Sequence, residues 1–314
     1  MHSKYRLVTR SDFDGLVCGM LLRELGMIDD IKFVHPKDMQ DGTVSITDRD
    51  IITNLPFVPG CHLAFDHHSS EVGRNGFTPH NHVIDATAPS AARVVYRHFG
   101  GKAAFPGVSA DLMAAVDKAD SAQFSRDEIL NPTGWTLLNF LMDSRTGLGR
   151  FHTFRVSNYD LMMQLIEKCR QLSAAEVLAL PDVQERVELY MAHRELFAEQ
   201  IRRCASVHGP LVMLDLRNEP TIFAGNRFMI YALFPQCNIS VHVMWGLKQQ
   251  NTVFAIGKSI LDRSSPVDIG TVCASYGGGG HEAAGTCQIS NENAEAVRLE
   301  LIDILNSTPA SKAA

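Results

Sequence analysis

The sequence predicts an α/β protein in which an N-terminal parallel sheet covered by helices is joined by a helical linker to a smaller C-terminal α/β domain. Three observations support this fold class. Short β-rich runs alternate with helical patterns in the first third of the chain, as in parallel sheets. Residues 158–203 show apolar residues at a period near 3.6, which is typical of helices. Strand-like runs begin again after residue 210. We therefore expect a first domain at 1–190, a linker at 191–209 and a second domain at 210–314.

Each element is predicted from its local pattern. A Pro-Ser pair before residue 91 is typical of a helix start, because proline fits the first turn and serine caps it. The expected strands of the first domain lie at 5–8, 31–34, 43–46 and 62–65, and its helices at 90–99 and 110–116. The second domain is expected to contain strands at 211–214, 239–244 and 252–256, followed by a glycine-rich turn at 277–280.

The composition describes a globular protein and excludes a polybasic nucleic-acid coat. The chain has 314 residues, 20% of them charged, and a formal net charge of −6. We therefore expect no long duplex nucleic acid as a partner. The seven cysteines form no C-x-x-C pair, which favours reduced thiols. No signal-peptide pattern and no run of eighteen apolar residues is found, so we expect a cytoplasmic protein without a membrane partner.

Acidic residues follow three of the expected strands. The stretch "RSDFDG" places two acids and a glycine directly after the first strand. In a parallel α/β sheet, ligands gather beyond the carboxyl ends of the strands, so these acids point to one shared site. Two further acids end the helical pattern that starts at residue 110. The candidates are Asp12, Asp14, Asp48, Asp66 with His67 and His68, Asp117 and Asp120.

Carboxylates with one or two imidazoles suit Mn²⁺, or alternatively Mg²⁺, and such a site holds one or two ions. Metal ions of this kind are used to hydrolyse phosphate esters. Simpler structural readings compete at two positions. Asp12 could cap a turn, and Asp48 could cap a helix that begins near residue 51.

The order of these motifs resembles the DHH phosphoesterase superfamily with its DHHA1 substrate domain, in the branch that includes nanoRNases and relatives of exopolyphosphatases. The resemblance rests on Asp-x-Asp-Gly at residues 12–15, Asp-His-His at 66–68, and Gly-Gly-Gly-Gly-His-x-Ala-Ala-Gly at 277–285, and it spans nearly the whole chain. It implies that the first domain is the catalytic DHH domain and the second the DHHA1 domain.

The resemblance also implies roles for single residues. Asp12 and Asp14 would each bind one metal, and Asp48 would bridge the two. His67 and Asp120 would complete the ligand set of the second metal, with Asp117 as the alternative to Asp120. His68 would lie beside the scissile phosphate as a ligand or proton donor, and Asp66 would hold an imidazole.

One position departs from the family pattern. Many members carry a metal-binding histidine on the first strand, whereas this chain has Val8-Thr9-Arg10-Ser11 there. A guanidinium stays protonated and cannot bind a cation. Arg10 could instead hold a substrate phosphate or fill the space of the lost ligand, and solvation at the surface is the competing interpretation. The number of bound metals is thereby left open.

Further residues are candidates for substrate binding. Consecutive glycines can bring several backbone N–H groups close to an anion, so Gly278, Gly279, Gly280 and His281 are expected to bind a phosphate or a nucleotide end. Ser90 and Arg93 resemble a family helix start near the site, with a helix cap as the equally simple alternative for Ser90. Phe228 and Tyr231 could stack a base, although a helix core is the stronger interpretation. Lys258 and Arg263 complete the set.

These observations predict a Mn²⁺-dependent phosphoesterase of small nucleotidic substrates: short oligonucleotides, 3′-phosphoadenosine 5′-phosphate or the products of cyclic dinucleotides. An exopolyphosphatase-like enzyme and an inactive nucleotide-binding regulator are the alternatives. The sequence does not fix the oligomeric state, and a homodimer is compatible with it.

Overall fold

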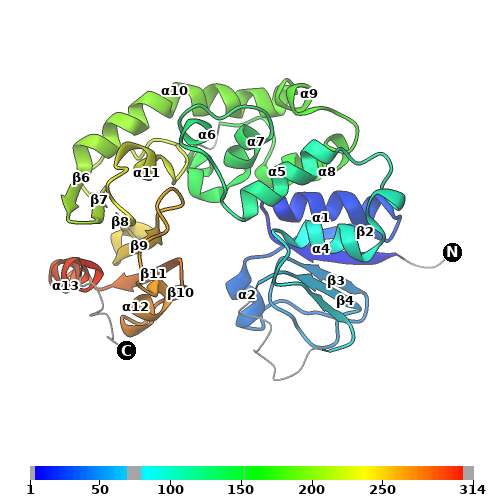
Figure 1. The fold of residues 1–314 in the computed structure, drawn as a ribbon, viewed down its shortest axis with the longest axis horizontal. Coiled ribbons are helices and arrows are strands. Elements are labelled where there is room, and N and C mark those ends of the chain that lie inside the picture. Colours follow the sequence, from blue (N-terminus) through cyan, green and yellow to red (C-terminus); the bar gives the residue numbers. More distant parts are fainter. Residues whose placement is uncertain (1–3, 69–78, 152, 307–314) are drawn as a thin grey trace. The chain divides into compact units, whose positions relative to one another are not determined.

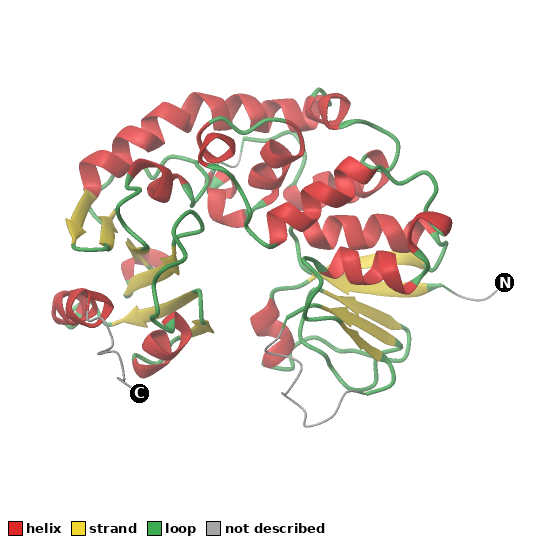
Figure 2. Ribbon diagram, viewed as in Figure 1, coloured by secondary structure: helices red, strands yellow, loops and turns green. Residues whose placement is uncertain are grey.

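The structure, a computed structural model, describes residues 4–68, 79–151 and 153–306 (Figure 1). The chain forms two compact units. The first unit consists of Met1–Gln123 and Pro132–Leu189, and the second of Phe124–Asn131 and Tyr190–Ala314. The predicted fold class is confirmed, since each unit combines a sheet with helices (Figure 2).

The first unit is built on a five-stranded parallel sheet with the strand order β2-β1-β3-β4-β5. Strand β1, which lies between β2 and β3, is buried at Leu7, Val8 and Thr9, because these strands pair with it on both edges and helices cover it. The strands are β1 (Tyr5–Thr9), β2 (Ile28–Phe33), β3 (Asp50–Thr53), β4 (Leu63–Asp66) and β5 (His82–Ile84).

Helices lie along the sheet of the first unit, and α1 is the most deeply buried of those with described burial. Every residue of α1 from Phe13 to Leu22 is buried, as expected for a helix with an almost continuous apolar sequence. Helices α4, α5 and α8 pack against α1 (Figure 1). The helices of this unit are α1 (Phe13–Glu24), α2 (Pro36–Gln40), α4 (Ala91–His98), α5 (Ala110–Asp120), α7 (Gly134–Met142), α8 (Asn158–Lys168) and α9 (Ala174–Leu178), and α10 (Pro181–Cys204) begins in it.

The third strand differs from its prediction. Residues 43–46 are not a strand, and β3 is formed instead by Asp50–Thr53, so the alternative in which Asp48 caps a helix near residue 51 is wrong as well. All four residues of β3 are buried, and its β-branched residues Ile51, Ile52 and Thr53 suit a central strand. Asp50 remains in the buried strand because Arg6 of β1 donates to both of its carboxylate oxygens (2.6 and 2.9 Å).

The second unit contains a six-stranded mixed sheet with the order β10-β11-β9-β8-β7-β6. The strands predicted at 211–214, 239–244 and 252–256 are confirmed as β7 (Leu211–Asp215), β8 (Ile239–Trp245) and β9 (Thr252–Lys258). The predicted linker differs, because its residues belong to α10 and to β6 (Ala205–His208), an edge strand of this sheet. The remaining elements are α6 (Arg126–Leu130), α11 (Met229–Leu233), α12 (Ile269–Ser275), β10 (Gly279–His281), β11 (Ala284–Ile289) and α13 (Ala294–Asn306).

The cysteines are free thiols, as the sequence predicts. All seven cysteines are free, and six of them are buried. Burial raises the pKa of Cys169 to about 12, so this thiol stays protonated at neutral pH. Among the described helices, none has the length and apolar character needed to cross a membrane.

A candidate metal centre at the carboxyl ends of the strands

The two acids of "RSDFDG" have different positions at the start of α1. Asp12 is the N-cap of the helix, and its Oδ1 accepts from the backbone N–H of Gly15 (2.9 Å). Asp14 lies in the first helical turn. The carboxylate of Asp12 is also paired with Arg10, whose Nε lies 3.1 Å from Oδ2. Asp12 therefore caps α1 and is ion-paired with Arg10.

Gly15 is required by the path of the chain around this turn. A Cβ atom at this position would lie 2.0 Å from the carbonyl oxygen of Arg10, a distance that no side chain can adopt. The adjoining strand ends are fixed by two buried threonines. Thr53 Oγ1 donates to Thr9 Oγ1 (2.8 Å), and Thr9 Oγ1 donates to the carbonyl of Thr53 (3.2 Å). The glycine and the threonines hold the loops after β1 and β3 close together.

Asp14 is a buried carboxylate held by the amino end of another helix. The backbone N–H of Ala92 donates to Oδ1 (2.8 Å) and that of Ala91 donates to Oδ2 (3.1 Å), both in the first turn of α4. Burial, together with the charges of Asp120 and Asp12, raises the pKa of Asp14 well above its ordinary value. A nearby cation would oppose this shift by favouring the charged carboxylate.

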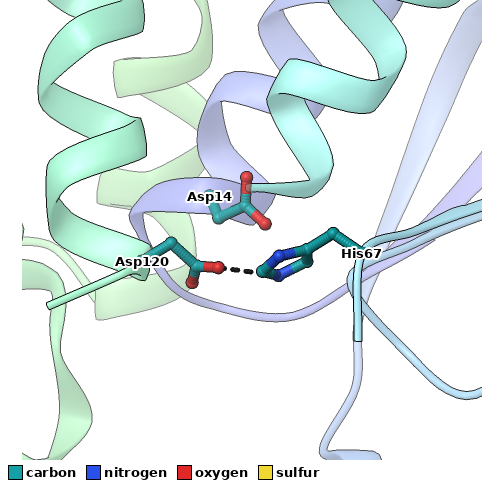
Figure 3. A group of neighbouring side chains, drawn as sticks. All are labelled: Asp14, His67 and Asp120. Atoms are coloured by element: carbon teal, nitrogen blue, oxygen red, sulfur yellow. Dashed lines mark ion pairs between the residues drawn. The ribbon is translucent and has the colours of Figure 1, made fainter. Parts of the chain in front are cut away.

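Asp14, His67 and Asp120 converge from three different elements (Figure 3). His67 follows β4, and Asp120 ends α5. One ligand atom from each of the three residues lies within 4.8 Å of the others. The Nε2 atom of His67 is 2.7 Å from Asp120 Oδ2, and its Nδ1 is 3.2 Å from the carbonyl oxygen of Ala88. Burial alone would lower the pKa of His67, but the bond to Asp120 and the nearby carboxylates raise it to about 9.

Asp66 orients the two histidines that follow it. Its Oδ1 accepts from the backbone N–H of His67 (2.7 Å) and of His68 (3.2 Å), and it lies 2.7 Å from His68 Nδ1. An ionised Asp66 fixes the proton of His68 on Nδ1, which makes Nε2 the nitrogen that exchanges a proton. Asp66 is almost completely buried, whereas His68 is partly exposed. This arrangement suits a proton-transferring histidine held by a buried carboxylate.

The bridging role expected for Asp48 is wrong. In the register of β1 and β3, Arg6 pairs with Asp50 and Thr9 pairs with Thr53. Asp48 precedes β3, so it lies at the amino end of the strand, away from Asp12, and its side chain is exposed. The residue at the carboxyl end of β3 is Asn54, which the sequence analysis missed.

Asn54 contacts Asp12 directly. Its Nδ2 donates to Asp12 Oδ1 (3.2 Å), and the residue is 2% exposed. Its backbone has a φ of +53°, a left-handed conformation that asparagine tolerates better than most residues. The buried Oδ1 has no hydrogen-bond partner among the described residues. The signal in the sequence was an asparagine directly after the β-branched run of residues 51–53.

The structure separates Asp117 from Asp120. Ser90 Oγ donates to Asp117 Oδ1 (2.8 Å), and Arg93 Nε donates to Oδ2 (2.9 Å). Asp117 is therefore held by Ser90 and Arg93, while Asp120 contacts His67. Ser90 is completely buried and caps α4 by accepting from the N–H of Arg93 (3.0 Å). The helix-cap interpretation of Ser90 is correct, and a substrate contact by this side chain is excluded by its burial.

Arg145 is a second residue that the sequence analysis missed. It lies in a short 3-10 helix, η2 (Ser144–Thr146), and donates to Asp143 from Nε (2.7 Å) and Nη2 (2.8 Å). Burial would lower the pKa of Arg145, but the charges of Asp143, Asp12 and Asp120 raise it. Its side chain is half exposed. Arg145 therefore carries positive charge near the acidic cluster and is accessible to an anion.

The candidates in the second unit lie around a glycine hairpin. The expected turn at 277–280 is in part strand β10, which pairs antiparallel with β11. A Cβ atom at Gly278 would lie 2.2 Å from the carbonyl oxygen of Thr286, and one at Gly280 would lie 2.3 Å from that of Ala284. These two glycines therefore allow close strand packing. Gly279, His281 and Arg263 are exposed, Lys258 pairs with Glu282 (3.0 Å), and Phe228 and Tyr231 are buried in the core.

The donor set of the first unit fits a divalent cation. Two carboxylates and one imidazole are hard or borderline ligands of the kind that Mn²⁺ and Mg²⁺ accept. Asp14, His67 and Asp120 would hold the ion, and the contacts of Asp14 with α4 fix its orientation.

The chain is similar to several proteins of known structure. The chain is 62% identical to the pGpG-specific phosphodiesterase PggH from Vibrio cholerae over 96% of this chain and 99% of that one, with a TM-score of 0.85. The fold is also similar to RecJ in complex with Mn²⁺ from Thermus thermophilus (15% identity, 97% of this chain, TM-score 0.54), although the chain spans about half of that protein (52%). A RecJ exonuclease bound to manganese gives a TM-score of 0.52 at 15% identity, covering 97% of this chain and 91% of that one. No protein-family model and no curated protein sequence matches the chain.

Proposed function

Because this chain belongs to the DHH/DHHA1 phosphoesterase superfamily, as a relative of the pGpG-specific phosphodiesterase PggH, we propose that it hydrolyses the phosphodiester bond of linear dinucleotides such as pGpG. Hydrolysis adds one water to pGpG and yields two molecules of GMP. The observation that carries the proposal is the 62% identity to a pGpG-specific enzyme along almost the full length of both chains.

Three side chains of the first unit are assigned to the metal. Asp14, His67 and Asp120 would bind one divalent cation, and Mn²⁺ is the ion we propose, with Mg²⁺ as the alternative. When bound, a divalent cation supplies Lewis-acid chemistry for attack of water on a phosphate ester. Asp14 is held in place by the two N–H groups of α4, so it is oriented before the substrate arrives.

His68 is assigned to proton transfer. Asp66 holds its Nδ1 at 2.7 Å, which leaves Nε2 to give a proton to the departing 3′ oxygen of the dinucleotide. Asp66 is a positioning residue in this scheme, since it acts through His68.

Arg145 is assigned to substrate binding. Its half-exposed guanidinium carries positive charge near Asp12 and Asp120, and a phosphate oxygen would accept from it. In the second unit, Lys258, Arg263, His281 and the exposed Gly279 stay candidates for binding the nucleotide.

The test is product analysis by chromatography. Purified protein is incubated with pGpG, 3′-phosphoadenosine 5′-phosphate or polyphosphate, with Mn²⁺ or with a chelator. We expect GMP from pGpG only in the presence of the metal. The Asp14→Asn variant should lose on the order of 100-fold or more in rate, because a metal ligand is removed. Asp29→Asn makes the same chemical change on the exposed side of β2 and should retain full activity.

The alternatives give different outcomes. Orthophosphate from polyphosphate without GMP from pGpG would assign the chain to polyphosphate hydrolysis. Binding of pGpG without any product, with or without metal, would identify a nucleotide-binding regulator and contradict the proposed enzyme.

A further inference from the structure

We propose that this centre holds a single divalent cation, bound by Asp14, His67 and Asp120, and that Arg10 and Asn54 replace a second ion at Asp12. The inference rests on the proposed function for the presence of a metal, but it concerns the number of ions and the residues that exclude one. It differs from the two ions that the family resemblance implies.

The carboxylate of Asp12 is already in contact with other groups of the chain. It accepts from the backbone N–H of Gly15 (2.9 Å) and from Asn54 Nδ2 (3.2 Å), and it forms an ion pair with the guanidinium of Arg10 (3.1 Å). A cation at Asp12 would have to displace a guanidinium, which stays protonated at every physiological pH. Asp12 therefore acts as a helix cap and as an anchor for Arg10.

Asn54 places a neutral amide, and not a carboxylate, next to Asp12. It occupies the carboxyl end of β3, beside the loop that carries Asp12, and it presents an amide donor to that carboxylate. The orientation of the amide is assigned from this contact, because a carboxylate requires an N–H facing it. Turning the amide over to offer its oxygen to a cation would place two oxygens against each other at Asp12. Asn54 thus provides no negative charge, and the group that it presents to Asp12 is a hydrogen-bond donor and not a metal ligand.

The charges around the centre are balanced by one divalent ion. The single charge of Asp12 is matched by Arg10. Asp14 and Asp120 together carry two negative charges, and their ligand atoms lie with that of His67 within 4.8 Å. One divalent ion neutralises this cluster, and a second ion would add two positive charges beside Arg10 and Arg145.

The number of bound ions can be measured without reference to activity. Metal-free protein is titrated with MnCl₂ by calorimetry, and Mn²⁺ bound after gel filtration is counted by elemental analysis. We expect one ion per chain and the electron paramagnetic resonance spectrum of an isolated Mn²⁺. The Asp120→Asn variant should lose this ion, the Asp12→Asn variant should retain it, and Asp29→Asn should bind as the unaltered protein does.

A gain-of-binding variant tests the role of the two replacements. Arg10→His with Asn54→Asp supplies an imidazole and a carboxylate next to Asp12, so we expect two ions per chain and a spectrum of coupled Mn²⁺ pairs. Circular dichroism checks that this variant folds. If it does not fold, the number of Mn²⁺ ions bound by the unaltered chain alone tests the proposal. Two ions in the unaltered chain, or a single ion that is lost in Asp12→Asn and kept in Asp120→Asn, would overturn the proposal. Hydrolysis of pGpG is measured separately, so a failure of the proposed activity leaves this count valid.

Discussion

At the scale of single residues, the centre depends on carboxylates that orient other groups. Asp66 is the clearest example, because one oxygen contacts the N–H groups of both histidines and the Nδ1 atom of His68. Removing its charge leaves the shape of the side chain almost unchanged. A substitution that removes only this charge therefore tests the orienting role of Asp66 without changing how its side chain packs.

We expect Asp66→Asn to reduce the rate of pGpG hydrolysis by about 10- to 100-fold, as is common when a partner of a catalytic histidine is replaced. The reason is that a neutral amide no longer stabilises the positive charge of His68 when both of its ring nitrogens carry a proton. The pH profile of kcat should shift, while the number of bound Mn²⁺ ions stays the same. A variant that loses its metal, or one whose pH profile is unchanged, would contradict the positioning role.

Arg145 gives a second prediction at this scale. Arg145→Gln should raise KM for pGpG about 10-fold, because one hydrogen bond between charged groups is lost. Steady-state kinetics measure this change. Arg97→Gln is the matched control, since Arg97 is also exposed and also pairs with an aspartate, Asp85 (3.0 Å). Equal effects of the two substitutions would remove Arg145 from the substrate site.

The residues of the site were predictable to different degrees. Asp12, Asp14 and His67 belong to short motifs that directly follow strands, so the end of the sheet at which they lie was predictable. Their roles at a metal rested on the order of the motifs along the chain and stay predictions. Asn54 was missed because β3 could not be located: residues 43–46 and 50–53 both contain β-branched residues, and burial in the centre of the sheet decides between them. Arg145 lies in a short 3-10 helix whose approach to Asp12 is set by the packing of distant elements.

At the scale of elements, the turn from β1 into α1 is the most constrained part of the centre. Gly15→Ala should reduce the free energy of unfolding by about 1 to 3 kcal/mol, because a Cβ atom would meet the carbonyl oxygen of Arg10 and force the turn to move. Urea denaturation followed by circular dichroism measures this loss. Gly107→Ala has open space around its Cβ and should change stability by less than about 0.5 kcal/mol.

The central strand of the second sheet gives a prediction about pH. Burial and the charge of Arg227 lower the pKa of His242, on β8, to about 4, below its ordinary value of 6.5. The unfolded chain therefore binds this proton more readily than the folded chain, and His242 reduces stability as the pH falls from 6.5 towards 4. Above pH 6.5 it has no such effect.

We expect His242→Gln to become relatively more stable than the unaltered protein as the pH is lowered across this range, by at most about 1.4 kcal/mol per pH unit. Thermal unfolding of both proteins at pH 7.5, 6 and 5 measures the difference. A difference in stability that is independent of pH would show that His242 titrates normally in the fold.

At the scale of the whole molecule, metal binding should stabilise the chain. A ligand that binds only the folded state at about 100 times its Kd adds about 2.7 kcal/mol to the free energy of unfolding. Mn²⁺ should therefore raise the thermal midpoint, and a chelator should lower it. Hydrogen exchange should place the added protection in the first unit, around the amino ends of α1 and α4. Protection confined to residues 205–306 would contradict the location of the centre.

At this scale the fold class was predicted from the sequence, whereas the linker expected at 191–209 is occupied by α10 and β6. The alternation of strands and helices predicted a parallel sheet, and the three strands expected after residue 210 are all present. The boundary between units was harder to predict. Phe124–Asn131 belongs to the second unit although the residues on both sides belong to the first, and such an excursion has no local signature.

The positions of the ligand residues along the chain also determine when the centre can form during synthesis. Asp12 and Asp14 are translated early, whereas Asp120 follows about 110 residues later. At about 5–20 residues per second, the ribosome needs roughly 5–20 s to cover this interval. During that time Asp14 already exists without the partners that complete its ligand set. A nascent chain that ends before Asp120 therefore has no complete ligand set, and Asp14, His67 and Asp120 can bind a metal together only after the first 120 residues have emerged.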